Sequence, residues 1–402
     1  MSKRTKVLAT VMAAMTLTTA FMGCGSKGSD SSKGEKTLTV WSHLKTAEVN
    51  KLREKAEKWG EENNVKVTVQ EDTAEMQDAI TALQSSKGPD LYYGLANDNL
   101  GTYQKAGVLA EVKSGFINES DYTSKNVINA VTIDNKQYAV PIAQECLALF
   151  YNKDKVAEAP KTMEEAINIG KEKGFMFNAS DFYITFGFVS ANGGYVFKDN
   201  DGSLDTDDIG LANAGAIKGF ETLKKFVDDK LIAADITDDI AKGNFTDGKT
   251  ALYISGPWSV ADCKAVNLGI AELPTIDGQP MKPFLGVQTA FVSAKSDQDK
   301  QDLAWDLLKY LNKEMPDDLL TEGNRLPVLK SAQESDVYKS NEYMKVFSKQ
   351  AEIAIPMPNV REVQCMWTPA ANNLKALLNG SQDAKTSAEK TVEQIKEGIK
   401  QQ

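Results

Sequence analysis

The sequence has little histidine and little cysteine. Its 402 residues include one histidine, His43, and four cysteines. A zinc site built from several histidines is therefore excluded, and a serine or cysteine hydrolase would have to use His43 as its base. After Cys24, the remaining cysteines Cys146, Cys263 and Cys365 show no CxxC spacing. They allow at most one disulfide, and we predict no metal site and no cofactor.

An excess of positive charge is also absent. The chain has 46 Lys and Arg residues against 56 Asp and Glu residues, a formal net charge of −10, and it shows no basic cluster interleaved with aromatic residues. Nucleic acid is therefore not an expected partner. The composition, 42% hydrophobic and 25% charged, is typical of a globular protein. The length favours two domains, because a single core stops growing near about 250–300 residues.

The N-terminal segment has the pattern of an export signal followed by a tether. Three positive residues precede Val7–Ala20, an apolar stretch that is short for a bilayer span but suits a signal peptide. A buried N-terminal helix is the alternative. Phe21–Cys24 resembles the bacterial lipobox, whose cysteine is diacylated and becomes the mature N-terminus, with phenylalanine here where leucine is usual. We expect a signal peptide over residues 1–23, lipidation of Cys24, and a flexible tether over residues 24–36.

From Thr37 onward, short β-branched runs alternate with amphipathic helical patterns. This alternation predicts an α/β fold with a parallel sheet. Two hairpins are expected, one turning at Asp134-Asn135 and one around Asp199–Gly202. Later segments predict helices at Ala212–Asp229, Lys300–Asn312, Asn341–Ala351 and Thr386–Lys400, and strands at Thr250–Ile254 and Gly286–Ser293.

Aromatic residues and carboxylates occur together in loop-like positions. This combination suits a sugar, because the C–H faces of a pyranose pack on aromatic rings while its hydroxyls need partners once water is removed. An ionised carboxylate can accept two neighbouring hydroxyls at once. The candidate residues are Asp98, Glu145, Asp181, Tyr183, Trp258 and Trp367.

Several candidates have structural alternatives. Asp98 can cap the helix expected after it, and Glu145, which lies between apolar residues, can be a paired core carboxylate. Tyr183 lies in an apolar run, Phe182–Phe188, that can be entirely core. Trp258 follows Gly-Pro, where the chain must turn, and is less easily buried. Composition and spacing alone therefore predict only a polar, aromatic cleft.

A further feature is a set of segments spread through the chain. They are Thr39–Ser42, Asn64–Val69, Gly88–Gly101, Ala139–Asp154, Pro160–Glu165, Asn192–Phe197, Ile254–Trp258, Leu273–Val287 and Ile355–Val360. Taken in order, from about Thr37 to Leu378, they resemble the maltose- and maltodextrin-binding proteins. That family comprises the extracellular solute receptors of ABC sugar importers, which are lipoproteins in organisms with a single membrane.

The resemblance implies a two-lobe α/β fold like that of periplasmic binding proteins, with three hinge crossings and a ligand cleft between the lobes. The implied lobes are residues 37–143 with 290–323, and residues 148–284 with 330–402. The implied crossings are Ala143–Leu147, Leu285–Thr289 and about Gly323–Leu329. The family also implies a maltodextrin ligand, permease subunits as partners, a monomer, and a lipid anchor at the extracellular face of the bacterial cytoplasmic membrane.

Residue by residue, the family's sugar-binding positions fall mostly on similar residues. Asp98 and Glu145 match its acidic ligands, Asp181 and Tyr183 match a Glu-x-Tyr pair, and Trp258 and Trp367 match two stacking tryptophans. In a loop whose length differs from the family's, His43 is either a further hydroxyl partner or a solvent-facing residue. A third stacking tryptophan is replaced by Leu95, and two arginines are replaced by Asn99 and Ala371. The wall of the first lobe is therefore altered.

We predict a maltodextrin receptor that is not an enzyme. One alternative is a glycosidase in which Asp98, Glu145 and Asp181 supply the carboxylate pair. The other is a receptor of the same architecture for a different oligosaccharide or polar solute, which the leucine at position 95 keeps open.

Overall fold

The computed structural model describes residues 35–85, 87–200 and 202–402. The predicted signal peptide and the predicted lipidation site Cys24 lie outside these residues, as does most of the predicted tether. Among the described helices, none combines the length and the apolar character needed to cross a bilayer.

The larger sheet contains the first strands of the described chain. β1 (Lys36–Ser42) pairs in parallel with β2 (Val65–Glu71) and with β3 (Leu91–Ala96), so the predicted parallel arrangement is confirmed for these three strands. Because side chains alternate between the faces of a strand, Leu38 and Val40 of β1 both point into the core and are at most 1% exposed.

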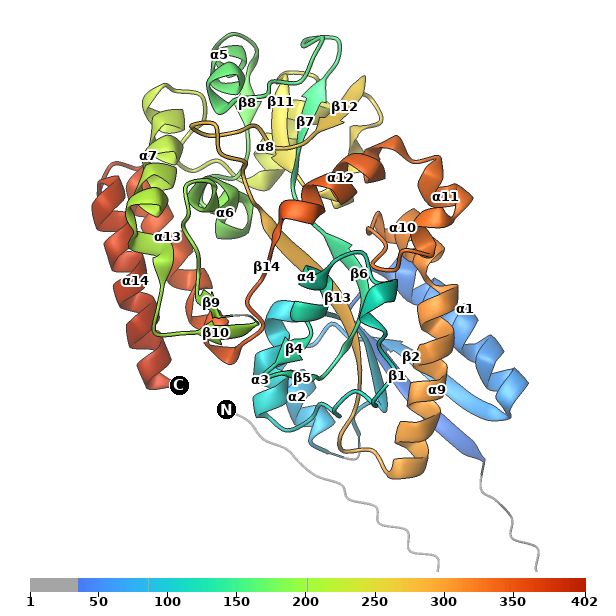
Figure 1. Ribbon diagram of the computed structural model, residues 1–402. Coiled ribbons are helices and arrows are strands. Elements are labelled where there is room, and N and C mark those ends of the chain that lie inside the picture. The colour runs from blue at the N-terminus through green and yellow to red at the C-terminus, as the bar shows by residue number, and fades with distance from the viewer. Residues whose placement is uncertain (1–34, 86, 201) are drawn as a thin grey trace, which may run out of the picture. The chain divides into compact units, whose positions relative to one another are not determined.

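Strands from much later in the sequence complete this sheet. β13 (Phe284–Val292) pairs antiparallel with β3 and with β6 (Val140–Glu145), and it pairs in parallel with β14 (Ile355–Pro356). Figure 1 shows β13 running between β6 and β14. All nine of its residues are buried, which suits a central strand.

A second sheet is formed by the middle of the chain. Its strands, in spatial order, are β12 (Leu268–Ala271), β7 (Ala148–Asn152), β11 (Leu252–Ser255) and β8 (Phe175–Met176). Its core is rich in phenylalanine, and the ring centroids of Phe175, Phe177 and Phe226 lie 4.9 to 5.5 Å apart. Aromatic pairs at such distances stabilise a core beyond the area that they bury.

Both predicted hairpins are confirmed. β4 (Thr132–Ile133) and β5 (Lys136–Gln137) are joined by Asp134 and Asn135, whose φ angles are 50° and 62°. Two consecutive positive φ angles define the tight turn that matches the twist of a hairpin. The second hairpin pairs β9 (Lys198–Asn200) with β10 (Ser203–Asp205).

The predicted helices are present, with ends shifted by a few residues. The helices are α1 (Thr46–Asn63), α2 (Met76–Leu83), α3 (Leu100–Lys105), α4 (Lys125–Asn129), α5 (Met163–Lys173), α6 (Phe182–Ala191), α7 (Ala214–Asp228), α8 (Asp238–Thr246), α9 (Gln298–Glu314), α10 (Pro316–Gly323), α11 (Asp336–Lys339), α12 (Glu342–Ile353), α13 (Trp367–Leu378) and α14 (Ala384–Gln401). Short 3₁₀ turns are η1 (Asn97–Asn99), η2 (Glu119–Asp121), η3 (Gly210–Ala212), η4 (Pro257–Cys263), η5 (Ala332–Glu334) and η6 (Arg361–Cys365).

The three predicted crossing segments lie side by side. β6 leads directly into β7 of the second sheet, and Glu145 of β6 pairs with Gly286 of β13. On the same strand, Gln144 exchanges two backbone hydrogen bonds of 2.9 Å with Leu326, which follows α10. Segments from three distant parts of the chain therefore meet between the two sheets. The residue boundaries given above for the lobes remain predictions.

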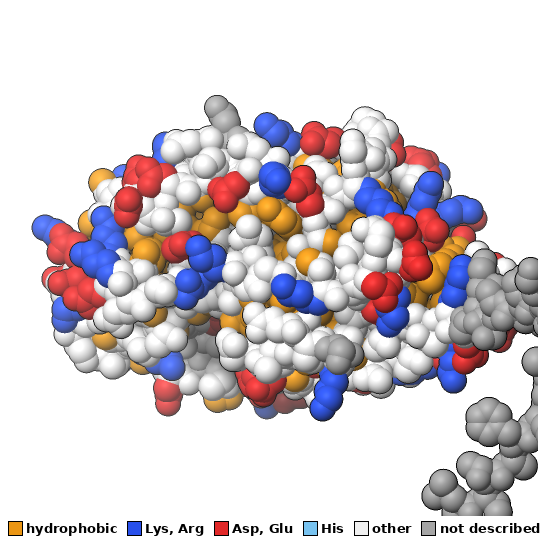
Figure 2. All heavy atoms as spheres, turned by 90° about the horizontal axis from the view of Figure 1, so that it is seen from below, with side chains coloured by type: hydrophobic (Ala, Val, Ile, Leu, Met, Phe, Trp, Pro, Cys, Tyr) orange, Lys and Arg blue, Asp and Glu red, His pale blue; other side chains and the backbone are white. Residues whose placement is uncertain are grey.

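Charges of both signs are scattered over one face of the protein. On the face shown in Figure 2, Lys and Arg side chains are interspersed with Asp and Glu side chains.

Candidate functional site

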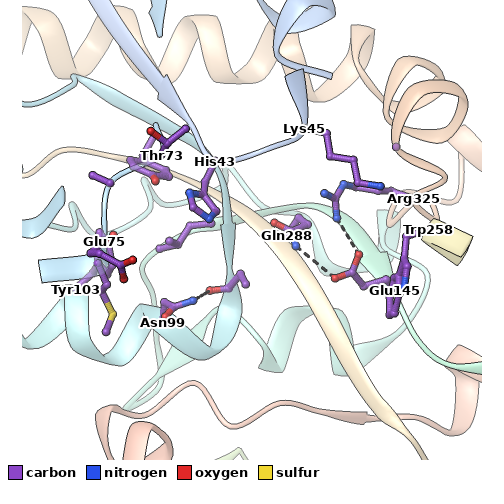
Figure 3. A pocket seen from close by; sticks show the side chains of 16 residues that line it. His43, Lys45, Thr73, Glu75, Asn99, Tyr103, Glu145, Trp258, Gln288 and Arg325 are labelled. Carbon is purple, nitrogen blue, oxygen red and sulfur yellow. Dashed lines mark hydrogen bonds and ion pairs between the residues drawn. The ribbon is translucent and has the colours of Figure 1, made fainter. Parts of the chain in front are cut away.

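A cavity of about 570 Å³ lies where the crossing segments meet (Figure 3). A cavity of this size can enclose a ligand of several hundred cubic ångströms. Its lining residues are His43, Lys45, Thr73, Ala74, Glu75, Met76, Tyr92, Leu95, Ala96, Asn99, Tyr103, Glu145, Trp258, Gln288, Gly323 and Arg325. Three of the seven predicted sugar-binding residues, His43, Glu145 and Trp258, are among them.

His43 lies in the cavity wall, just after β1. Its Nδ1 is 3.0 Å from the carbonyl oxygen of Asp72, which follows β2. The Asp72 carboxylate accepts a hydrogen bond of 2.7 Å from the hydroxyl of Tyr92 on β3. The ends of three neighbouring strands are thus tied together, and the exposed imidazole is held where its other nitrogen can meet a ligand.

Glu145 ends β6 and carries an ion pair. One of its carboxylate oxygens, Oε2, accepts a hydrogen bond of 2.8 Å from Arg325, and Gln288 of β13 lies 3.5 Å from the other, Oε1. Figure 3 shows Gln288 between this group and the group around His43. Glu145 is therefore paired, but the alternative that it is a core carboxylate is wrong, because its side chain is 18% exposed and lines the cavity.

Trp258 reaches the cavity from the second sheet. It lies in η4, directly after β11, where Pro257 begins the turn. Its indole packs so closely over Gly256 that a Cβ atom on that residue would collide with the ring. Glycine at position 256 therefore fixes the direction of the indole, and its partly exposed face is available to a ligand.

Tyr183 and Trp367 flank a shared phenylalanine beside this cavity. The ring centroid of Phe284, on β13, is 6.1 Å from that of Tyr183 and 6.0 Å from that of Trp367. The Tyr183 ring also lies 6.1 Å from Trp258. The Tyr183 hydroxyl is buried and has no hydrogen-bond partner among the described residues. A buried hydroxyl without a partner is costly. Neither Tyr183 nor Trp367 is among the residues that line the cavity, so a sugar contact for either stays a prediction.

Asp98 lies in η1, and Asn99 rather than Asp98 occupies the N-cap position of α3. The alternative that Asp98 caps that helix is therefore wrong. Burial raises the pKa of Asp98 from its ordinary value to about 6; a backbone N–H and the Trp367 side chain oppose the shift, and the charge of Glu145 adds to it. Asp98 is not among the residues that line the cavity, so a role for it in binding sugar stays a prediction.

Asp98→Asn is expected to stabilise the protein near neutral pH. The folded pKa of about 6 exceeds the ordinary 3.8, so ionising Asp98 penalises folding increasingly as the pH rises between these values. The variant should gain up to roughly 3 kcal/mol of unfolding free energy at about pH 7.5 and almost none near pH 4. Urea unfolding at both pH values measures the difference. An equal effect at the two pH values would contradict the assigned pKa.

Asp181 does not line the cavity. It is the N-cap of α6, and its Oδ1 accepts the backbone N–H of Tyr183 at 2.8 Å. Burial raises its pKa, and the backbone N–H groups of Tyr183 and Ile184 oppose that shift. Its contacts among the described residues are those of a helix cap that places Tyr183. A role for Asp181 in binding sugar stays a prediction.

Arg325 and Gln288 are lining residues that the sequence did not single out. Arg325 is one of only four arginines in the chain and lies within a predicted crossing segment. A rare charged residue at such a position could have been predicted to line the cleft. Its partners Glu48 and Glu145 are 277 and 180 residues away in sequence, so the pairing itself could not be read from spacing.

The described residues offer little for metal or redox chemistry. Cys146, Cys263 and Cys365 are unpaired, and no group of three or more His, Cys, Asp or Glu side chains within the described ranges is arranged to hold a metal ion. What the arrangement provides is aromatic faces together with fixed hydrogen-bonding groups.

Comparisons with known proteins identify the family. Residues 54–346 match the pattern of the family described as bacterial extracellular solute-binding protein. The chain belongs to this family. Its members bind solutes outside the cell, so the predicted extracellular, solute-binding character of the protein is confirmed at that level.

Relatives match along their whole length. A galactooligosaccharide-binding protein of Bacillus subtilis is 31% identical, with 99% of this chain and 98% of the relative covered. A maltooligosaccharide ABC transporter solute-binding lipoprotein of Streptococcus pneumoniae is also 31% identical, with the same coverage. The resemblance to oligosaccharide-binding receptors of ABC importers is thereby confirmed.

A solved structure supports the fold. The maltose-maltodextrin binding protein of Alicyclobacillus acidocaldarius is 32% identical and superposes with a TM-score of 0.82, over 90% of this chain and 100% of that protein. The predicted two-lobe α/β fold class is therefore confirmed.

Proposed function

We propose that this solute-binding protein is the receptor that captures α-linked gluco-oligosaccharides for an ABC importer. The observation that carries the proposal is that one cavity holds both the Trp258 indole and the Glu145–Arg325 ion pair, with Tyr183 beside it. An aromatic face packs on sugar C–H groups, and the fixed polar groups satisfy hydroxyls. The named ligands of two relatives, maltooligosaccharide and maltose-maltodextrin, support the same substrate class.

Binding is proposed to favour a hinge-closed state. Glu145 and His43 belong to the six-stranded sheet and its loops, whereas Trp258 follows a strand of the second sheet. A sugar that contacts both groups is held more tightly when the lobes approach each other. Only such a difference in affinity between the open and closed states can shift their populations. In this proposal the closed state is the one that the permease subunits recognise.

The test is a titration of the mature, unlipidated chain with maltose, maltotriose and maltotetraose in a calorimeter. Saturable binding of at least one of them at a ratio of one sugar per chain is expected. Galactobiose and galactotriose serve as matched sugars with different stereochemistry. Chromatography of the maltotetraose sample after incubation tests the glycosidase alternative, because release of glucose or maltose would contradict a receptor that performs no hydrolysis.

A galactooligosaccharide is the second candidate ligand. One relative is named for it, and Leu95 lines the cavity where the resembled family has a stacking tryptophan. Loss of an indole removes a platform for one ring and changes the shape of the first-lobe wall. If the galactose-containing sugars bind and the maltooligosaccharides do not, the ligand is a galactooligosaccharide and the α-glucan proposal is wrong.

We also propose that the receptor is anchored through a diacylated Cys24 after removal of residues 1–23. The support is the lipobox-like sequence Phe21–Cys24 and the word lipoprotein in the name of the Streptococcus relative. Two acyl chains provide stable anchoring, and a tether of Gly, Ser and charged residues lets the receptor reach the permease. Mass spectrometry of the native N-terminal peptide should find a lipid-modified Cys24; an unmodified mature cysteine would contradict the anchor.

A further inference from the structure

One arginine connects two carboxylates from distant parts of the chain. The Nε of Arg325 donates to Glu48 Oε1 at 2.6 Å, and its Nη2 lies 3.3 Å from Glu48 Oε2. The remaining nitrogen, Nη1, donates to Glu145 Oε2 at 2.8 Å. The guanidinium is therefore held at all three nitrogens. Figure 3 shows Arg325 and Glu145 facing each other across one end of the cavity.

Glu48 provides a rigid support for this arginine. It lies in the first turn of α1, its side chain is 0% exposed, and its Oε2 also accepts the backbone N–H of Lys45 at 3.0 Å. Gly323 approaches so closely that a Cβ atom there would collide with the carboxylate. Glu48 does not line the cavity. Because a guanidinium is a planar fork of N–H donors, the two contacts with the Glu48 carboxylate fix the plane of the Arg325 guanidinium.

The two carboxylate oxygens of Glu145 differ in their hydrogen bonding. Oε2 is committed to Arg325 at 2.8 Å, whereas Oε1 has only a long contact of 3.5 Å with Gln288 Nε2. The Glu145 side chain is 18% exposed and lines the cavity. Oε1 therefore keeps most of its capacity to accept a hydrogen bond. Without Arg325, the carboxylate can rotate and both oxygens lose their fixed direction.

We propose that Arg325 is a positioning residue for the ligand, which clamps Oε2 of Glu145 so that Oε1 is presented to a sugar hydroxyl. The inference rests on the proposed function, because it needs a hydroxyl-bearing ligand in this cavity. Pre-orienting an acceptor lowers the entropy cost of binding, so the arginine strengthens binding through Glu145. Lysine at this position keeps a positive charge but cannot hold both carboxylates in a fixed plane.

A double-mutant cycle tests this role. Arg325→Gln, Glu145→Gln and the double variant are titrated with the maltooligosaccharide that the unmodified chain binds. Arg325→Gln alone should weaken binding about tenfold or more, as Glu145→Gln does, whereas adding Arg325→Gln to Glu145→Gln should cost less than about threefold. A merely structural role for Arg325 does not produce this coupling. Equal losses in both backgrounds would mean that Arg325 acts on the sugar independently of Glu145, and would overturn the proposal.

Removing Arg325 leaves Glu48 buried without its partner, so folding must be checked by circular dichroism. If Arg325→Gln does not fold, Arg325→Lys replaces it in the cycle and is expected to lose severalfold in affinity; unchanged affinity would overturn the proposal. Arg53→Gln is the matched control, because Arg53 lies on α1, bonds Asn50 and the Val69 carbonyl, and does not line the cavity. An unmodified chain that binds no maltooligosaccharide would contradict the proposed function, which is a separate outcome.

Discussion

Trp258→Ala is expected to weaken maltotriose binding by about 1–3 kcal/mol, the scale of losing one buried aromatic contact. The indole is the aromatic face that the second sheet contributes to the cavity lining. The Trp258 ring packs over Gly256. We expect the backbone around Gly256 to keep its conformation when the ring is removed. Affinity should therefore fall while the fold is retained.

Calorimetry with maltotriose measures this loss, and two variants sharpen it. Trp258→Phe keeps a smaller aromatic face and should lose less affinity than the alanine variant. Trp59→Phe alters a tryptophan that is 6% exposed in the core of the six-stranded sheet and should leave the affinity unchanged. Unaltered binding by Trp258→Ala would remove Trp258 from the site.

Phe284→Ala is expected to destabilise the protein by about 3–5 kcal/mol and to weaken sugar binding as well. Phe284 is completely buried, and its ring stacks on Phe186 with centroids 3.8 Å apart. It also packs beside Tyr183 and Trp367. A cavity at this position removes support from both predicted ligand contacts, because surrounding side chains relax only partly into the space.

Urea unfolding and calorimetry together test the second prediction. Phe284→Leu keeps much of the volume and should lose less stability. Phe116→Ala is the control, because Phe116 is only partly buried and packs against Trp305, with ring centroids 5.0 Å apart, in the core cluster that contains Trp59 and not Phe284. It should cost less stability and no affinity. If Phe284→Ala loses stability but binds maltotriose normally, Tyr183 and Trp367 do not depend on Phe284 for sugar binding.

Local patterns predicted the regular elements well. The Asp134-Asn135 turn follows from residues that tolerate positive φ, and the parallel pairing of β1 with β2 and β3 follows from alternating strands and helices. Helix α6 did not follow, because nine of its ten residues are buried. A helix that is apolar on every side lacks the spacing by which an amphipathic helix is recognised.

The candidate site was predictable only in part, for a similar reason. Residue chemistry and family resemblance pointed to Glu145 and Trp258, and both line the cavity. The same reasoning predicted that Asp181 binds sugar with them, whereas in the structure the Asp181 carboxylate caps α6. The Arg325 network depends on contacts between residues 180 or more positions apart, which no local pattern records.

The adjacent crossing segments also bear on ligand length. β6, β13 and the segment at Leu326 are hydrogen-bonded side by side, so in the hinge closure proposed above these segments would form the pivot. Groups next to a pivot, such as Glu145 and Gln288, move little relative to the opposite lobe. A glucose unit bound there therefore contributes little to the difference in affinity between the open and closed states. Units that extend away from the pivot span a gap that changes more, and longer chains should therefore drive the rotation more strongly than disaccharides do.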